Sequence, residues 1–358
     1  MLQLPITEPT QPLDATSCWD WLLRPVKRRQ TSKLRWRVLQ LGEPLETHWP
    51  ALCEAWRSEP DFRHAPPPEV PTRLLTVASE MADPVDRTRK WLLQCRDGRR
   101  IETVLIPNSR TDRATVCVSS QVGCGVRCEF CETGRLGLVR NLMTTEILEQ
   151  MLIARQAAHA LGLRLRNVVF MGMGEPLHNW GNVCVAVEWM LRDDGFYFSP
   201  SHVSMSTAGS LRNLWDCAHR FPKLRLAISL HSCIPRIRRR LVPRGVGSVS
   251  EIRNAIAAIN QCFPGRTVWL ELVMIRGLTD RDEDVAALID FCRGLNVEIN
   301  LIPFNRMESD VEAGLQRTDA DRISEVALRL RGAGYFTTIR YSGGQNIAAA
   351  CGQLAARG

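Results

Sequence analysis

Short apolar runs alternate with helix-length segments from residue 113 onward, and this alternation constrains the fold more than any other feature of the chain. We predict strands at 167–171, 202–206, 224–230, 268–273 and 297–302. The clearest helices begin near Thr144 and near Asp280, each with a polar N-cap and early acidic residues. Strands separated by helices pair in parallel, so the pattern predicts an α/β fold whose sheet is closed or partly closed into a barrel. Functional residues are then expected at the carboxyl ends of the strands.

A β-hairpin is expected just before this alternating region. Residues 66–112 begin with a segment that is too rich in proline for a helix or an inner strand, which indicates a stiff linker. Two strand-like runs follow at 90–95 and 99–106, on either side of Asp97-Gly98. Because an Asp-Gly pair favours the tight turn of a hairpin, we predict that the two runs pair with each other.

The N-terminal part of the chain is predicted to be a separate helical module over residues 1–65, because its apolar and tryptophan residues alternate with charges. The core with a cysteine-bearing tail then spans 113–358. A basic run at 24–29 within the module either contacts nucleic-acid phosphates or forms a solvated helix face.

Three thiols lie within eight residues at Cys124, Cys128 and Cys131, with the spacing C-x-x-x-C-x-x-C. A structural zinc ion normally takes four ligands from separated pairs, and no second pair follows within range. Three cysteines can instead hold a [4Fe–4S] cluster and leave one iron open to a cofactor such as S-adenosylmethionine. The alternative interpretation is three buried or zinc-binding cysteines.

Composition narrows the class of protein further. The chain has 358 residues, enough for a large core, and no stretch of it reaches the length of a membrane span. Its start lacks a basic and apolar leader, so we expect a cytoplasmic protein without membrane contact. Thirteen cysteines in such a chain favour metal binding or thiol chemistry over a disulfide framework. The net charge of +8 favours a polyanionic partner.

Polar or glycine-rich residues follow four of the predicted strands. They form the segments 171–176, 206–209, 229–231 and 303–305. Each segment alone is a weak signal, because a Gly-Glu-Pro turn or a Ser-Leu-His run also occurs by chance. Their shared position at the carboxyl ends of the strands is the stronger indication of a site.

Taken together, these motifs resemble the RlmN/Cfr family of radical S-adenosylmethionine enzymes, which methylate adenine in ribosomal RNA. The resemblance covers residues 99–354 and is most specific at 113–124, at the three cysteines, at the Gly-Met-Gly-Glu-Pro turn and at 349–354. It implies a partial (βα)6 radical SAM barrel with a small N-terminal helical module and a β-hairpin extension.

The resemblance also implies a role for each site residue. The [4Fe–4S] cluster is assigned to Cys124, Cys128 and Cys131. S-adenosylmethionine is assigned to Gly174, Glu175, Ser206, Ser229, Leu230, His231 and Asn305. Cys351 is expected to accept a methyl group, Cys117 to resolve the intermediate through a transient disulfide with Cys351, and Glu102 to accept a proton.

The chemistry of the substrate explains these roles. Carbon 2 of adenine lies between two ring nitrogens and is too electrophilic to attack an ordinary methyl donor, so the family's route carries the methyl group on a cysteine and adds it as a radical. The implied partners are 23S rRNA, with tRNA as a further substrate, and an electron donor such as flavodoxin. We expect a monomer.

The chain departs from the family pattern at several positions: Ser232–Pro235, Arg244-Gly245, Gly343 and Asn346. The family's Phe-Arg-x-x-Gln signature is not found in the N-terminal module. Methylation of carbon 8, or of another RNA, therefore remains an alternative. Two alternatives from other classes are a radical enzyme acting on a non-RNA substrate and a metal-stabilised RNA-binding protein without catalysis.

Overall fold

The computed structural model describes residues 19, 22–23, 29–57, 73–305 and 314–356. The proline-rich linker at 66–71 and positions 24–28 of the basic run lie outside the described residues.

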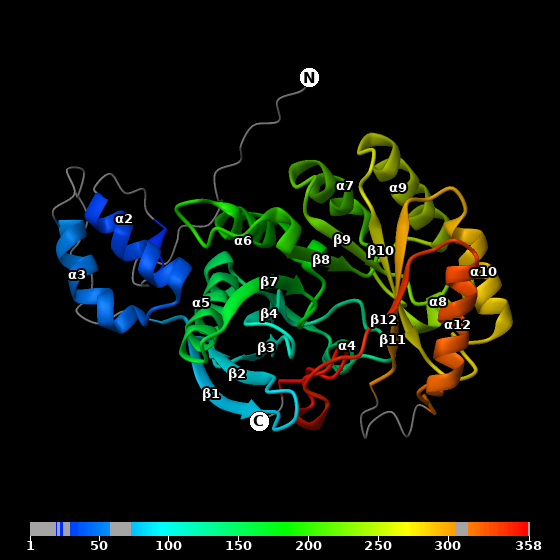
Figure 1. The fold of residues 1–358 in the computed structure, drawn as a ribbon, viewed down its shortest axis with the longest axis horizontal. Coiled ribbons are helices and arrows are strands. Elements are labelled where there is room, and N and C mark those ends of the chain that lie inside the picture. The colour runs from blue at the N-terminus through cyan, green and yellow to red at the C-terminus, as the bar shows by residue number, and fades with distance from the viewer. Residues whose placement is uncertain (1–18, 20–21, 24–28, 58–72, 306–313, 357–358) are drawn as a thin grey trace.

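In the described part of the chain, ten strands form one sheet in the order β1-β2-β3-β4-β7-β8-β9-β10-β11-β12 (Figure 1). The strands are β1 (Leu75–Ala82), β2 (Arg89–Cys95), β3 (Arg100–Pro107), β4 (Arg113–Cys117), β7 (Arg164–Phe170), β8 (Val203–Thr207), β9 (Arg225–Ser229), β10 (Val268–Met274), β11 (Val297–Pro303) and β12 (Thr337–Ile339). From β4 to β12 all neighbours pair in parallel, whereas β1 to β4 pair antiparallel. The carboxyl ends of the parallel strands therefore meet along one rim.

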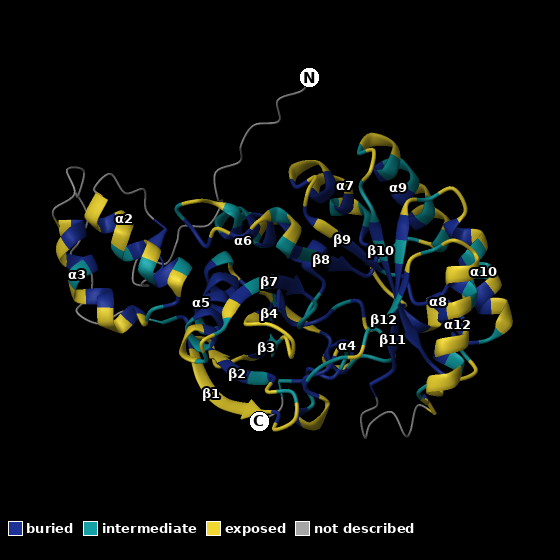
Figure 2. Ribbon diagram, in the orientation of Figure 1, coloured by how far each residue is buried: buried dark blue, intermediate teal, exposed yellow. Residues whose placement is uncertain are grey.

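Helices follow the parallel strands and pack on the sheet with their apolar faces (Figures 1 and 2). They are α5 (Thr144–Ala160), α6 (Trp180–Leu191), α7 (Leu211–Arg220), α8 (Pro235–Leu241), α9 (Val249–Cys262), α10 (Asp282–Cys292) and α12 (Ala320–Gly332), with short 3-10 turns at Pro176–Asn179, Pro200–His202 and Gln345–Ile347. The short α4 (Glu132–Leu136) has no buried apolar side chain. None of the helices among the described residues has the length and apolarity to span a bilayer.

The five predicted strands are confirmed as β7 to β11, and the hairpin is confirmed as β2 and β3. Three strands of the ten-stranded sheet were not predicted, and one of them is β4, which joins the antiparallel and parallel parts of the sheet. β1 pairs with β2 at the edge of the sheet, and only its first residue is buried, so pairing with β2 rather than burial of an apolar face holds it in the sheet. β12 has three residues and continues the parallel sheet beside β11. The antiparallel extension is therefore a three-stranded unit rather than a hairpin alone.

The two predicted helix starts are also confirmed, since α5 begins at Thr144 and α10 at Asp282. The expected polar N-cap of α5 is wrong, because Met143 occupies that position. The Glu146 carboxylate instead accepts the Met143 backbone N–H at 2.8 Å. An acidic side chain in the first turn can thus replace the missing cap.

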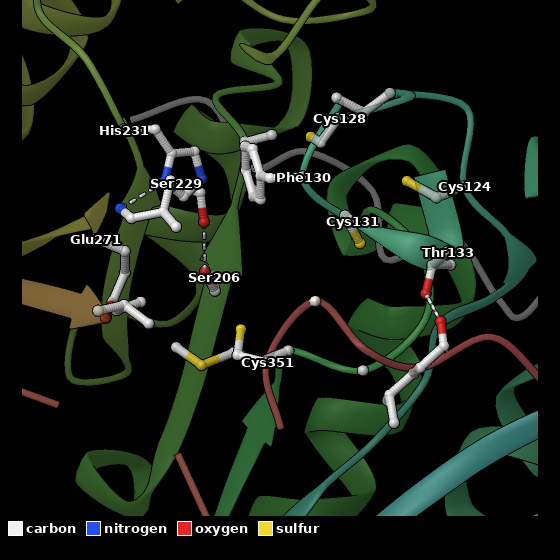
Figure 3. Close-up of a pocket in the computed structure, with 18 of the residues that line it drawn as sticks. Cys124, Cys128, Phe130, Cys131, Thr133, Ser206, Ser229, His231, Glu271 and Cys351 are labelled. Atoms are coloured by element: carbon white, nitrogen blue, oxygen red, sulfur yellow. Dashed lines mark hydrogen bonds between the residues drawn. The ribbon is translucent and has the colours of Figure 1, made fainter. Parts of the chain in front are cut away.

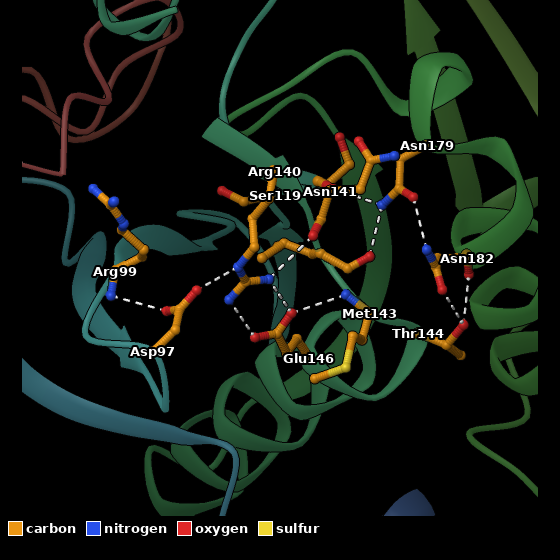
Figure 4. A network of polar contacts seen from close by, with 12 residues as sticks. Asp97, Arg99, Ser119, Arg140, Asn141, Met143, Thr144, Glu146, Asn179 and Asn182 are labelled. Carbon is orange, nitrogen blue, oxygen red and sulfur yellow. Dashed lines mark hydrogen bonds and ion pairs between the residues drawn. The ribbon is translucent and has the colours of Figure 1, made fainter. Parts of the chain in front are cut away.

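A polar network joins the hairpin turn, the short β5–β6 ribbon and the start of α5 (Figure 4). β5 (Gln121–Gly123) and β6 (Leu138–Asn141) pair antiparallel and enclose the three-cysteine segment. Arg140 donates to both oxygens of the buried Glu146 at 2.8 Å and to Asp97 at 2.6 Å. Asn179 donates to the carbonyls of Ser120 and Leu142 at 2.8 Å each. These bonds hold the two ends of the cysteine segment against the barrel.

The N-terminal helices pack against α5 and the loop after α6. They comprise α2 (Arg29–Trp36), a π-helical turn (Arg37–Leu41) and α3 (Leu45–Arg57). Trp19 Nε1 donates to Glu149 on α5 at 3.0 Å, and Arg155 of the same helix donates to the Gln40 carbonyl at 2.7 Å. This module lies on the far side of α5 from the rim that carries the site (Figure 1).

Candidate active site

A cavity lies at the carboxyl ends of the parallel strands, on the rim where the sequence predicted a site. It contains about 990 Å³ of space, part of it open to solvent. Most of the predicted site residues line it: Cys124, Cys128, Cys131, Gly174, Glu175, Ser206, Ser229, His231, Asn305 and Cys351 (Figure 3). Among the predicted residues, Leu230, Cys117 and Glu102 do not line this cavity.

The three cysteines of the motif lie on one side of the cavity, in the loop between β5 and β6 (Figure 3). Burial raises the pKa of Cys124 to about 12 and also raises the pKa values of Cys128 and Cys131. Thiols in such surroundings ionise only beside a compensating positive charge, which a bound iron–sulfur cluster would supply. In the described residues no three His, Cys, Asp or Glu side chains converge on a single metal ion. A four-iron cluster would take each of the three thiolates at a different iron, and all three thiols line one cavity.

The Gly-Met-Gly-Glu-Pro turn follows β7 and brings Glu175 into the cavity. The Glu175 carboxylate accepts the Ala208 N–H at 2.7 Å and the Leu177 N–H at 3.1 Å, and burial raises its pKa. The carboxylate thus ties the end of β7 to the end of β8. Gly174 has a φ of 104°, and a Cβ there would lie 2.6 Å from the Gln121 side chain.

Replacement of Gly174 by Ala is therefore expected to destabilise the protein by about 2 to 4 kcal/mol, because backbone strain and a steric clash add together. Gly181→Ala is the matched control, since Gly181 is exposed in α6 and a Cβ there would meet nothing within 4 Å. The control should be neutral or gain up to about 1 kcal/mol from helix propensity. Urea unfolding of both variants measures the difference. Equal stability of the two variants would show that the turn tolerates a side chain.

The ends of β8 and β9 contribute hydroxyl and imidazole groups. The hydroxyls of Ser206 and Ser229 lie 3.2 Å apart. His231 Nδ1 accepts the Val273 N–H at 3.2 Å, so the ring proton lies on Nε2. Burial, with a smaller effect of Arg238, lowers the pKa of His231 to about 3, which keeps the ring neutral. Its edge packs on Phe130 with the ring centroids 4.6 Å apart.

The C-terminal tail carries Cys351 into the cavity. Asn305 Nδ2 donates to the Cys351 carbonyl at 3.2 Å, which ties the end of β11 to the tail. Cys351 also lines a second, adjoining cavity together with Cys117, at the end of β4. Both cysteines are free thiols in this structure. The tail therefore places Cys351 between the cavity of the three-cysteine loop and the cavity that contains the Cys117 thiol.

Glu102 binds the end of the tail instead of lining the main cavity. Its carboxylate accepts the N–H groups of Ala355 at 2.7 Å and Ala356 at 3.0 Å, and it pairs with Lys90 Nζ at 3.0 Å. Lys90 Nζ also donates to the Ala348 carbonyl at 3.2 Å. In this arrangement Glu102 and Lys90 clamp the tail on both sides of Cys351.

Comparisons with known proteins agree with the family resemblance seen in the sequence. Residues 118–289 match the model of the radical SAM superfamily. A probable RNA methyltransferase of Rhodopirellula baltica is 41% identical over 78% of this chain and 73% of its own length. The dual-specificity RNA methyltransferase RlmN of Magnetococcus marinus is 41% identical over 75% of this chain and 74% of its own. The chain belongs to the RlmN/Cfr family of radical SAM methyltransferases.

A solved structure supports the family fold over nearly the whole molecule. The crystal structure of a radical SAM methyltransferase from Sphaerobacter thermophilus superposes with a TM-score of 0.80 at 34% identity, covering 91% of this chain and 92% of that one. Membership of the radical SAM superfamily implies S-adenosylmethionine and an iron–sulfur cluster. The cavity described above offers three thiols and several polar groups for them.

Two of the departures from the RlmN/Cfr pattern lie where the tail meets the turn between β1 and β2. Asn346 donates through Nδ2 to Asp83 at 3.2 Å, so an aspartate at position 346 would face a like charge. Position 343 is closely packed, since a Cβ on Gly343 would lie 2.9 Å from the Thr88 hydroxyl and 3.0 Å from the Asp86 carboxylate. These two residues therefore belong to the contact between the tail and the β1–β2 turn, and neither of them lines the main cavity.

The sequence missed a buried arginine that shapes the site of this methyltransferase. Arg238 of α8 donates to the carbonyls of Leu230 and Ala208 at 2.6 Å and of Ser229 at 3.1 Å. It thereby fixes the ends of β8 and β9, and the side chain of Leu230 points into the core. Leu230 can meet a cofactor only through its backbone. The segment Pro235–Leu241 contains several arginines, and nothing in the sequence distinguishes Arg238 from the others.

Proposed function

We propose that this chain methylates adenine in 23S rRNA, at carbon 2, through a methyl group carried on Cys351, and that tRNA is a further substrate. The observation that carries the proposal is the position of Cys351. It lines both the cavity of the three-cysteine loop and the cavity that contains Cys117. The names of the RlmN relatives describe dual-specificity RNA methyltransferases, which supports RNA as the substrate class.

The residues of the main cavity are assigned to the cofactors by this proposal. Cys124, Cys128 and Cys131 hold the [4Fe–4S] cluster. The polar rim binds S-adenosylmethionine through Gly174, Glu175, Ser206, Ser229, His231 and Asn305, and Leu230, which does not line the cavity, contributes its backbone. When bound, and on reduction by a donor such as flavodoxin, these groups supply a methyl group and a carbon-centred radical. The neutral His231 offers its Nε2–H as a donor, and the Phe130 ring beside it offers an apolar face.

The two thiols of the second cavity, those of Cys117 and Cys351, have different roles in the proposed reaction. Burial raises the pKa of Cys117 to about 12 and that of Cys351 to about 11, so both are protonated near neutral pH. The Arg340 guanidinium opposes both increases. Cys351 loses its proton and accepts the methyl group on sulfur. After this carbon has joined the base, Cys117 loses its proton and its sulfur bonds to Cys351 sulfur. The bond from Cys351 sulfur to that carbon breaks, its electron pair stays with the carbon, and the carbon takes up a proton to become the methyl group of the product.

Glu102 is the proposed acceptor of the ring proton. Its contacts with the tail show what must change before it can accept that proton. The carboxylate is occupied by the N–H groups of Ala355 and Ala356. The end of the tail must therefore release Glu102 before it can receive a proton from a base. The target adenine must also leave its stack to enter the cavity.

Nucleoside mass spectrometry of RNA from a deletion strain tests the proposal. We expect 2-methyladenosine to disappear from 23S rRNA, to return with the wild-type chain and to stay absent with Cys351→Ala. Loss of 8-methyladenosine instead would support the alternative ring carbon. RNA with no altered nucleoside would contradict the proposed substrate.

A further inference from the structure

Glu271 is a buried acidic residue of the cavity to which the proposed chemistry assigns no role. It lies on β10, is 2% exposed, and lines the main cavity on the side opposite the three cysteines (Figure 3). Its Oε1 accepts a hydrogen bond from Asn300 Nδ2 at 2.9 Å. Its Oε2 accepts none from the part of the chain that the structure describes.

The positive charge of Arg340 lies near Glu271 Oε2 but beyond hydrogen-bond distance. Arg340 Nη1, at the end of β12, lies 3.8 Å from Glu271 Oε2 and donates to the Met171 sulfur at 3.1 Å. A buried carboxylate oxygen without a hydrogen bond is costly, and a carboxylate beside a guanidinium presents an acceptor next to a donor. This pair therefore suits a ligand that brings its own N–H donor together with an acceptor nitrogen.

Asn300 also fixes which way the carboxylate faces. The Asn300 side-chain oxygen accepts from the Thr338 hydroxyl, so its amino group must point to Glu271 Oε1. Oε2 is then the atom left for a ligand. Glu271 and Arg340 also both lie close enough to the Cys351 thiol for their charges to act on it.

We propose that Glu271 and Arg340 form the subsite that recognises the target base as a 6-aminopurine. Glu271 Oε2 accepts a hydrogen bond from the exocyclic amino group, and the Arg340 guanidinium donates to the neighbouring ring nitrogen. Guanine and uracil present a carbonyl oxygen where the amino group would stand, and that oxygen faces the carboxylate unfavourably. This inference rests on the proposed function, because it names how the site beside Cys351 selects its substrate. Glu271 lines the main cavity and Arg340 lines the adjoining cavity, and Cys351 lines both.

The test compares three single-stranded RNA oligonucleotides that differ at one position in a pyrimidine sequence. The position holds adenosine, purine riboside, which lacks the amino group, or inosine, which carries a carbonyl. The cluster-reconstituted protein is used without S-adenosylmethionine, so that fluorescence anisotropy reports binding alone. We expect the wild type to bind the adenosine strand about 10-fold more tightly than the purine strand, as for one hydrogen bond to a charged group. The inosine strand should bind most weakly.

The matched variants are Glu271→Gln and Glu298→Gln. With Asn300 fixed, the glutamine must turn its amino group toward the cavity, where it faces the exocyclic amino group of adenosine. Glu271→Gln should therefore remove the preference for the adenosine strand over the purine strand. Glu298 lies on the neighbouring strand β11, outside the cavity, and its variant should keep the wild-type order. An unchanged order in Glu271→Gln would overturn the proposal. If that variant does not fold, equal binding of the three strands by the wild type would overturn it.

A separate measurement distinguishes the cofactor from the substrate. Equilibrium dialysis with S-adenosylmethionine should give the same affinity for the wild type and Glu271→Gln. A large loss of cofactor affinity, with the order of the strands unchanged, would assign Glu271 to the cofactor and overturn the inference. RNA methylation by a wild type that binds all three strands equally would contradict this inference alone, whereas the absence of RNA methylation would contradict the proposed function.

Discussion

Cys117→Ala is expected to trap RNA covalently on the protein. The variant keeps Cys351, so the methyl group can still be loaded and joined to the base, but no thiol remains in the second cavity to attack Cys351 sulfur. The adduct should appear as a nuclease-sensitive shift on a denaturing gel, and product release should fall by at least about 100-fold. Cys351→Ala should form neither adduct nor methylated RNA.

Cys184→Ala is the control for the loss of a buried thiol. Cys184 is buried in α6, away from both cavities, so this variant should release product as the wild type does. Mass spectrometry of the digested protein confirms whether Cys351 carries the methyl group. A Cys117→Ala protein with methylated Cys351 and normal product release would remove Cys117 from the mechanism.

Replacement of any one of Cys124, Cys128 or Cys131 by Ala is expected to abolish the cluster. Two thiolates do not hold a four-iron cluster stably, and the cavity offers no other thiol except that of the tail cysteine. Reductive cleavage of S-adenosylmethionine should then fall below detection. Iron and sulfide analysis after anaerobic reconstitution, with the visible absorbance of the protein, measures the loss.

Cys262→Ala provides the matched control, because Cys262 is an exposed cysteine at the end of α9. It should bind the same iron and sulfide as the wild type. A variant of the three-cysteine loop that kept full iron content and full cleavage would show that the ligands are misassigned.

Local sequence patterns predicted much of the barrel because they depend on neighbouring residues. The apolar runs identified β7 to β11, and the Asp97-Gly98 turn identified the hairpin. The predicted polar N-cap of α5 was wrong because residues distant in the sequence take part in capping this helix. Glu146 takes over the capping while Arg140 and Asp97 hold it in place, and a local pattern does not show that network.

The sequence alone determined the spacing of the three cysteines, the succession of strands along the chain and the rim at which the polar segments meet, since these follow from patterns along the chain. Only the tertiary structure decided which distant groups share a space. It brings Ala355 to Glu102, 253 residues away, and places Cys351 beside the cavity of Cys117. It also leaves one oxygen of Glu271 without a hydrogen bond among the described residues. Such contacts arise from the packing of separate elements around one core, and no local pattern encodes the distance between them.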